Sequence, residues 1–232
     1  MTDSSVAMAD GAVTFLDVLG WKGIWAREGD PGGAVERLRT MLKLAKEIAD
    51  EFSKKNRGVT TEVKSISDTI VLQTAGAAEL TLLIHATVCK QLVCKSIDLQ
   101  LPLRGAVAYG RFLPGAGEND TIVVGPAVDE AASWHEATDW IGVIMTPHAA
   151  LSVSAPVAGE QGWVHYSGVP LKRGRAPGIL SLDWTADWAA GLDELRASFR
   201  QMGPLVPEIA PKYLNTLAFF ENQRSAKERG VA

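Results

Sequence analysis

Residues 12–21 of the chain read AVTFLDVLGW. So continuous an apolar run predicts a strand buried on both faces over Ala12–Leu19, and Gly20 marks its end. One acid, Asp17, interrupts the run. An unpaired carboxylate inside a buried strand costs several kcal/mol, so we expect a positively charged group to compensate Asp17.

A second informative segment, residues 59–74, reads VTTEVKSISDTIVLQT. Polar and apolar residues alternate over Val59–Ser67, and a mostly apolar run follows over Thr69–Thr74. Two such runs joined by a short polar turn predict a β-hairpin, with Asp68 at its tip.

Two helices and another strand complete a six-element unit. Apolar residues at helical spacing predict helices over Gly33–Phe52 and Ala77–Ser96, and Leu103–Phe112 predicts a strand. The order strand, helix, strand, strand, helix, strand is the ferredoxin-like βαββαβ arrangement, an α+β fold whose antiparallel sheet carries both helices on one face. In this topology the hairpin tip lies beside the end of the first strand, so Asp68 is expected close to Asp17.

The rest of the chain predicts additions to this core. We expect a strand over Thr121–Val124, a helix over Pro126–Glu136, a strand over Trp140–Met145, short strands between Gly162 and Asp183, and terminal helices over Thr185–Met202 and Leu205–Arg224. We divide the chain into a main domain, residues 1–184, and a C-terminal helical extension, residues 185–232, packed on that domain or on a dimer partner.

The composition excludes several classes of function. The 232 residues include 23 Lys and Arg against 27 Asp and Glu, a formal net charge of -4, which disfavours binding to nucleic acid or to an anionic membrane. No apolar run reaches the length of a membrane span and the N-terminus does not read as a signal peptide, so we expect a cytoplasmic protein. Cys89 and Cys94 are the only cysteines, too few for a disulfide scaffold. P-loop, Rossmann and nucleophile-elbow motifs are absent.

The two acids point to a metal ion. Two close carboxylates repel each other unless they share a proton or a cation. Magnesium prefers one or two protein carboxylates, with water and phosphate oxygens completing its coordination shell. Asp17 and Asp68 therefore predict a divalent metal that carries a triphosphate.

Four segments share their order and spacing with a known family: FLDVLGW (15–21), VKSISD (63–68), LRGAVAYGRF (103–112) and VVGPAVDEAA (123–132). Over roughly residues 12–178 the chain resembles class III nucleotide cyclase domains. The resemblance implies a homodimer with active sites at the interface and two Mg²⁺ or Mn²⁺ ions per site. It also implies attack of the ribose 3′-hydroxyl on the α-phosphate, with release of pyrophosphate.

The resemblance also assigns roles to individual residues. Asp17, Asp68 and the backbone of Val18 would hold the metals, and Lys64 would face the base. Arg104, which opens an R-x-G-x-x-x-G strand, would contact phosphate oxygens, and Lys172 or Arg173, in a Lys-Arg-Gly turn, would reach the terminal phosphates. Backbone N–H groups around Leu19, Gly20 and Trp21 are further candidates for binding phosphate, since the chain passes there from strand to helix.

Three positions depart from the adenylate cyclase pattern. Asp129 stands in place of an Asn, Ser133 in place of a transition-state Arg, and Ile122 in place of the residue that reads the base. The Ile side chain offers no hydrogen bond to an exocyclic amine. Compensation for the missing Arg would come from Arg104, Arg111 or the metals.

Three interpretations remain. The chain resembles the stand-alone bacterial cyclases of Pycsar antiphage defence, which make cyclic UMP or cyclic CMP from UTP or CTP. Such a cyclase would signal to a separate effector that binds the cyclic nucleotide. The alternatives are a divergent adenylate or guanylate cyclase, and an inactive cyclase-like module that binds nucleotide. The four histidines show no metal-binding spacing; His85 is expected to be structural, and His135, although it lies near Asp129 in the sequence, is not assigned to the site.

Overall fold

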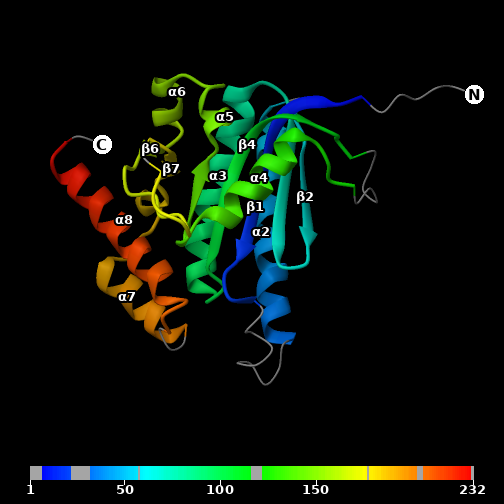
Figure 1. Ribbon diagram of the computed structural model, residues 1–232. Coiled ribbons are helices and arrows are strands. Elements are labelled where there is room, and N and C mark those ends of the chain that lie inside the picture. Colours follow the sequence, from blue (N-terminus) through cyan, green and yellow to red (C-terminus); the bar gives the residue numbers. More distant parts are fainter. Residues whose placement is uncertain are drawn as a thin grey trace, which may run out of the picture.

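A computed structural model describes residues 7–21, 32–56, 58–115, 122–176, 178–202 and 206–230. A seven-stranded sheet in the order β2-β3-β1-β4-β5-β7-β6 forms its centre (Figure 1). The strands are β1 (Ala9–Val18), β2 (Thr61–Ile66), β3 (Thr69–Ala75), β4 (Leu103–Phe112), β5 (Gly142–Met145), β6 (Trp163–His165) and β7 (Leu180–Leu182).

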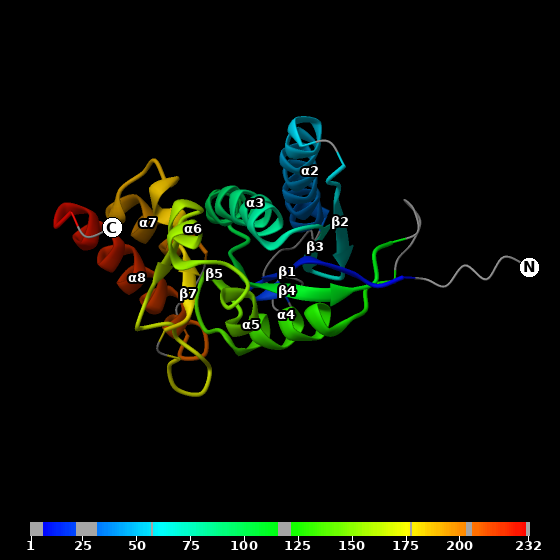
Figure 2. The same ribbon diagram turned by 90° about the horizontal axis from the view of Figure 1, so that it is seen from above.

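Helices cover both faces of the sheet. They are α2 (Gly32–Lys55), α3 (Ala78–Asp98), α4 (Pro126–Ala137), the short α5 (Pro147–Ala150) and α6 (Ala155–Glu160), the 3₁₀ helix η2 (Trp184–Ala186), α7 (Leu192–Gln201) and α8 (Ala210–Glu228). Seen from above, α2 and α3 lie on one face of the β1–β4 region and α4 lies on the other (Figure 2). The two helices of the predicted six-element unit therefore share a face, as expected, and α4 covers the face that this unit leaves open.

The ferredoxin-like core is confirmed. Strands β2, β3, β1 and β4 are adjacent and antiparallel, and Asp17 pairs in register with Thr69 on one side and Arg104 on the other. The sheet as a whole is mixed, because β5 joins β4 in parallel. The pairing with β3 and β4 places the acid of β1 between the hairpin and the start of β4.

Strand β1 is mostly apolar because it is covered on both faces. Alternate residues point to opposite sides of a strand. Leu16 belongs to the large core, and Val13 and Phe15 belong to a second cluster. This second cluster also contains Val71, Ala108, Phe112, Ala127, Val128 and Ala131. Asp17 follows on the side of Phe15, where the cover provided by α4 ends.

Helix α3 passes a composition test for a membrane span, with a mean hydropathy of 1.3 over its most apolar 18 residues. Much of it is buried within the fold, including Leu82, Ile84, Val88 and Leu92. Its apolar character therefore has an explanation in the core of the domain.

Three expected elements differ from the structure. Residues 122–124 form no strand. The Leu113 N–H, just after β4, donates to the backbone oxygen of Val124 at 2.9 Å. Thr121 lies outside the described residues. The helix expected from Thr185 begins at Leu192, where the Gly191 N–H donates to the Glu194 carboxylate.

The last expected helix begins at Ala210 and ends at Glu228, with Pro211 in its first turn, whereas the expected start, Leu205, is outside the described residues. A proline fits the first turn because the N–H that it lacks has no partner within the helix there.

Helix α8 packs on the β5 side of the sheet. The ring of Phe219 meets Trp140 at a centroid distance of 4.9 Å and Tyr166 at 5.0 Å. The Ile141 N–H donates to Thr216 Oγ1 at 2.8 Å, and the Asn215 side chain donates to a backbone oxygen at 2.9 Å. These contacts fix the N-terminal part of α8 beside the ends of β1 and α4.

Candidate active site

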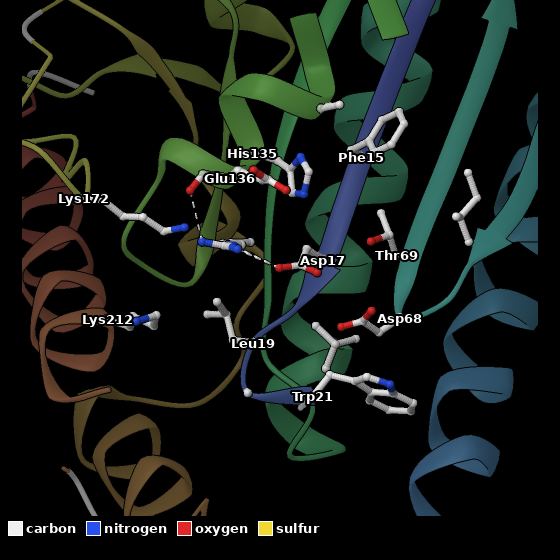
Figure 3. Close-up of a pocket in the computed structure, with 15 residues that line it drawn as sticks. Phe15, Asp17, Leu19, Trp21, Asp68, Thr69, His135, Glu136, Lys172 and Lys212 are labelled. Atoms are coloured by element: carbon white, nitrogen blue, oxygen red, sulfur yellow. Dashed lines mark hydrogen bonds and ion pairs between the residues drawn. The ribbon is translucent and has the colours of Figure 1, made fainter. Parts of the chain in front are cut away.

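A cavity of about 610 Å³ lies where β1 and the hairpin end, beneath the last turn of α4 (Figure 3). This volume falls in the usual range for a small-molecule site. The lining residues come from six separate parts of the chain: Phe15, Asp17, Val18, Leu19, Gly20, Trp21, Ile66, Asp68, Thr69, Arg104, Ala132, His135, Glu136, Lys172 and Lys212. We refer to it as the site cavity.

The structure brings Asp17 and Asp68 to the same cavity, as the topology predicted. The Val18 N–H donates to the backbone oxygen of Asp68 at 3.3 Å, which ties the hairpin tip to the end of β1. In the turn, Ser67 adopts a positive φ of 57°. The juxtaposition of the two acids therefore follows from strand pairing and from a strained two-residue turn.

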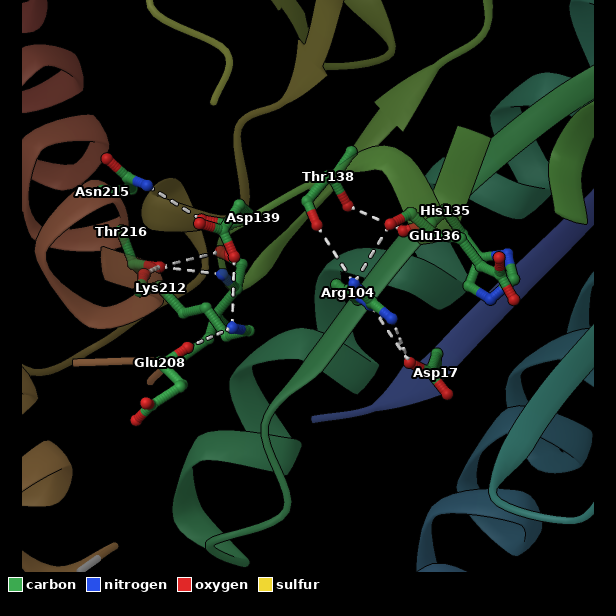
Figure 4. Close-up of polar contacts among 11 residues, drawn as sticks. Asp17, Arg104, His135, Glu136, Thr138, Asp139, Glu208, Lys212, Asn215 and Thr216 are labelled. Carbon is green, nitrogen blue, oxygen red and sulfur yellow. Dashed lines mark hydrogen bonds and ion pairs between the residues drawn. The ribbon is translucent and has the colours of Figure 1, made fainter. Parts of the chain in front are cut away.

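The group that compensates Asp17 is Arg104. Its Nε and Nη2 donate to Oδ2 of Asp17 at 3.0 and 2.9 Å, and its Nη1 donates to the backbone oxygens of Glu136 and Thr138 (Figure 4). The side chains of Arg104 and Asp17 are 11% and 18% exposed. The guanidinium thus holds the carboxylate and the end of α4 together, a role that the sequence does not predict.

The turn after β1 contributes backbone to the cavity. Val18 is 2% exposed and lines the cavity beside Asp17. The Leu19 N–H donates to the backbone oxygen of Pro102 at 2.8 Å, so this N–H is engaged within the fold. Gly20 and Trp21 also line the cavity.

Two lysines reach the site cavity from the side opposite the hairpin (Figure 3). Lys172 belongs to the Lys-Arg-Gly turn, as expected. Burial lowers its pKa, and the positive charges of Arg104 and Lys212 lower it further. Within the described residues Lys172 makes no ion pair, so its charge is available to an anion.

Lys212, His135 and Glu136 were not assigned to the site from the sequence alone. Lys212 lies in the first turn of α8, outside the region that resembles cyclases. His135 is 7% exposed and packs its ring on Phe15 at 5.7 Å; burial lowers its pKa, opposed in part by Asp17. The helical spacing of α4 was the available signal for His135, because a residue four positions after Ala131 lies on the same face of the helix.

The two acids fit a divalent metal held together with a polyphosphate. Within the described residues no third His, Cys, Asp or Glu completes a cluster with them. Magnesium needs only one or two protein carboxylates when phosphate oxygens and water supply the other ligands. Both hydrogen bonds from Arg104 go to Oδ2 of Asp17, which leaves Oδ1 for another ligand.

Lys64 does not line the site cavity. It lies further back on β2, where its Nζ pairs with the Glu62 carboxylate at 2.9 Å and donates to Gln73 Oε1 at 3.4 Å. Its side chain is 17% exposed. The residue expected to face a base and the residues expected to hold metals are therefore separate within one protomer.

The positions that depart from the adenylate cyclase pattern lie on or before α4. Ile122 is 54% exposed, Asp129 is exposed, and the Ser133 hydroxyl donates to the backbone oxygen of Asp129 at 2.8 Å. Ser133 and Arg173 line a second cavity of about 330 Å³, which borders the site cavity at Lys172. Arg111 pairs in register with Asp10 at the far end of β4 and does not line the site cavity of its own protomer.

No protein-family model matches the chain, and no curated protein sequence does. Solved structures do match. The adenylyl cyclase CyaB from P. aeruginosa superposes with a TM-score of 0.51 at 15% identity, over 76% of this chain and 95% of CyaB.

Two further structures give the same result. An adenylate cyclase from Trypanosoma brucei in its monomeric state matches at a TM-score of 0.51 and 12% identity, over 75% of this chain and 87% of that one. A bacterial light-regulated adenylyl cyclase matches at a TM-score of 0.50 and 12% identity, over 85% of this chain and 100% of that one. The chain therefore has the fold of nucleotide cyclase domains.

Proposed function

We propose that the chain is a metal-dependent nucleotide cyclase that converts UTP into 3′,5′-cyclic UMP and pyrophosphate. The observation that carries the proposal is the site cavity itself. Two aspartates from neighbouring strand ends line one side of it, and the cations Lys172 and Lys212 line the other. A metal-bound triphosphate has the complementary charge distribution, with phosphate oxygens for both the metal and the ammonium groups.

Asp17, Asp68 and the carbonyl of Val18 would hold the metal. When bound, the metal would neutralise phosphate charge and activate the 3′-hydroxyl, which is the chemistry that cyclisation requires. Arg104 orients the Asp17 carboxylate, since two of its N–H groups bind one carboxylate oxygen. Lys172 binds and orients the terminal phosphates.

The separation of Lys64 from the site cavity supports a homodimer with sites at the interface. If Lys64 faces the base, a nucleotide seated on Asp17 and Asp68 of one protomer takes its base contact from the Lys64 of the other. Apolar side chains exposed near these residues, Ile66 at 47% and Val124 at 48%, supply surface that a partner would cover.

The choice of a pyrimidine rests on the α4 region. Ile122 provides no side-chain hydrogen bond to a purine amine, and the Ser133 hydroxyl is engaged with its own helix. A smaller base needs fewer of these contacts. We place the enzyme in the cytoplasm, as a stand-alone cyclase of Pycsar antiphage defence whose product activates a separate effector.

The proposal is tested by incubating the purified protein with Mn²⁺ and each of ATP, GTP, CTP and UTP in separate reactions, with mass spectrometry of the products. Cyclic UMP is the expected product. Cyclic CMP alone would make it a cytidylate cyclase, and a purine product alone would overturn the pyrimidine assignment. No product from any of the four would favour an inactive nucleotide-binding module.

The metal assignment has matched variants. Asp17→Asn and Asp68→Asn keep the side-chain shape and are expected to lower the rate of cyclisation by at least about a hundredfold, since each removes a charged metal ligand. Asp10→Asn is the control, because Asp10 is exposed at the other end of the same strand. Full activity of either site variant would remove the assignment.

A further inference from the structure

We propose that Lys212, in the first turn of α8, is a phosphate-binding residue that grips the terminal phosphates of the nucleotide and the pyrophosphate that leaves. This inference rests on the proposed function, since it takes a triphosphate as the ligand. It gives the C-terminal helices a direct part in the site.

The first argument is that Arg104 is already committed. Three of its nitrogens donate to Asp17 and to two backbone oxygens in the last turn of α4 and just beyond it. Rotating it toward a phosphate would leave a carboxylate that is only 18% exposed without its partner. The cations left to bind terminal phosphates are those on the opposite wall of the site cavity.

The second argument is the geometry of Lys212. Its Nζ binds Oδ1 of Asp139 at 3.1 Å and the backbone oxygen of Glu208 at 2.8 Å (Figure 4). A lysine ammonium has three N–H donors, so these contacts leave one for a ligand. The side chain is 20% exposed, and it lines both the site cavity and a neighbouring cavity of about 250 Å³ formed with Leu19 and Gly20.

The third argument is charge. Burial lowers the pKa of Lys172, and the positive charges of Arg104 and Lys212 lower it further, against the opposing charges of Glu136 and Asp139. Arg104 and Lys212 are thus near enough to act on Lys172, and an anion with several charges would interact favourably with cations that converge in this way. A triphosphate that bridges Lys172 and Lys212 is that anion.

The fourth argument is the way in which α8 is fixed. Asn215 donates to the backbone oxygen of Asp139, and Phe219 packs against Trp140 and Tyr166. Lys212 is therefore held on a rigid element, and little side-chain freedom remains to be lost when phosphate binds. Binding of phosphate should in turn stabilise α8.

The test measures binding of inorganic tripolyphosphate, in the presence of Mg²⁺, by calorimetry on the full chain. Lys212→Gln is expected to weaken binding about tenfold or more, as for loss of a charge-assisted hydrogen bond. Lys227→Gln is the matched control, because Lys227 lies on the same helix and pairs with Asp183 at 3.0 Å but does not line the site cavity. It should leave the dissociation constant within twofold.

A second variant separates binding from a purely structural ion pair. Asp139→Asn breaks the same pair but keeps Lys212, so it should bind tripolyphosphate as tightly as the unmodified protein or more tightly. If Asp139→Asn and Lys212→Gln weakened binding equally, or if Lys212→Gln bound normally, the proposal would be wrong. Failure of the unmodified protein to bind tripolyphosphate would also overturn it.

The same measurement is independent of cyclase chemistry. Tripolyphosphate has no ribose and no base, so the affinity reports only on the phosphate subsite. The unmodified protein could bind tripolyphosphate, and Lys212→Gln bind it more weakly, while no nucleotide gives a cyclic product. That result would support the role of Lys212 and reject the proposed cyclase activity.

Discussion

At the scale of single residues, the strand register pairs the Asp17 carboxylate with the Arg104 guanidinium. The two residues lie opposite each other on β1 and β4. The same contact orients a part-buried carboxylate through Oδ2 and leaves Oδ1 for the proposed metal. A cation from the neighbouring strand β4 thus offsets the free-energy cost of placing a carboxylate in an apolar strand.

Replacing Arg104 by Met should destabilise the fold by about 2 to 3 kcal/mol, because it leaves Asp17 and two backbone oxygens without their donor. Urea unfolding measures the change. Arg196→Met is the control, because the Arg196 pair with Glu221 is 41% and 51% exposed, and such exposed pairs contribute less than about 1 kcal/mol. Equal effects in both variants would contradict this account.

His85 gives a second prediction at this scale. Its ring nitrogens bind the hydroxyls of Thr14 at 2.6 Å and Thr74 at 2.8 Å, and burial lowers its pKa to about 3. The folded state therefore keeps the ring neutral while the unfolded state protonates near pH 6.5. The contribution of His85 is fully present above pH 6.5 and is lost as the pH falls toward 3, by up to about 1.4 kcal/mol per pH unit.

Urea unfolding at pH 7.5, 6 and 5 measures this dependence. His85→Gln should be less stable than the unmodified protein at pH 7.5, and its stability should fall less steeply toward pH 5. His165→Gln, which replaces an exposed histidine, should keep the original slope. If the free energy of unfolding fell equally steeply with pH in the unmodified protein and in His85→Gln, the pH dependence would not come from His85.

At the scale of elements, the hairpin of β2 and β3 places Asp68 through a turn without glycine. Ser67 has a φ of 57°, which costs a residue with a side chain about 1 to 2 kcal/mol. Ser67→Gly removes that cost but adds backbone entropy of about 0.5 to 1 kcal/mol in the unfolded chain. A net stabilisation of about 0.5 to 1 kcal/mol is expected in thermal or urea unfolding.

The control for the turn is Ser65→Gly on the preceding strand. Ser65 donates its hydroxyl to the backbone oxygen of Ser67 at 3.2 Å, and glycine inside a strand is unfavourable. This variant should lose stability. A loss in Ser67→Gly as well would mean that the serine side chain itself supports the turn.

Also at this scale, α4 and α8 complete the site that the first six elements begin. Helix α4 covers the face of the sheet that carries Phe15. Arg104 of β4 donates to backbone oxygens in the last turn of α4 and just beyond it. Helix α8 brings Lys212 to the opposite wall. The hairpin and β1 supply acids, and the later elements supply cations.

At the scale of the whole molecule, the proposed dimer makes a quantitative prediction. Asp17→Asn and Lys64→Gln should each be inactive alone. If every site combines the aspartates of one protomer with the Lys64 of the other, a mixed dimer of the two variants has one intact site. Random exchange of protomers should then restore about a quarter of the original specific activity.

The restoration is measured as cyclic product after the two variants are unfolded together and refolded. Mixing either variant with itself is the control and should restore nothing. A mixture that stays inactive although both variants form dimers, or a strict monomer at high concentration in sizing experiments, would rule out a composite site.

The sequence by itself determined the βαββαβ core and the meeting of Asp17 with Asp68. Both follow from local signals, because strand alternation and helical spacing record which faces are buried, and the order of the six elements restricts the topology. The apolar run around Asp17 also established that a cation had to lie beside it. These features depend on the spacing of nearby residues or on the order in which the strands and helices follow one another.

The tertiary structure decided which groups meet in the site cavity. That Arg104 serves Asp17, that His135 turns toward the cavity, and that Lys212 reaches it from α8 all depend on contacts between distant segments. Periodicity states that a face is buried but does not identify what covers it. The partners of a charge are set by the packing of whole elements against each other, because long-range contacts leave no local pattern in the sequence.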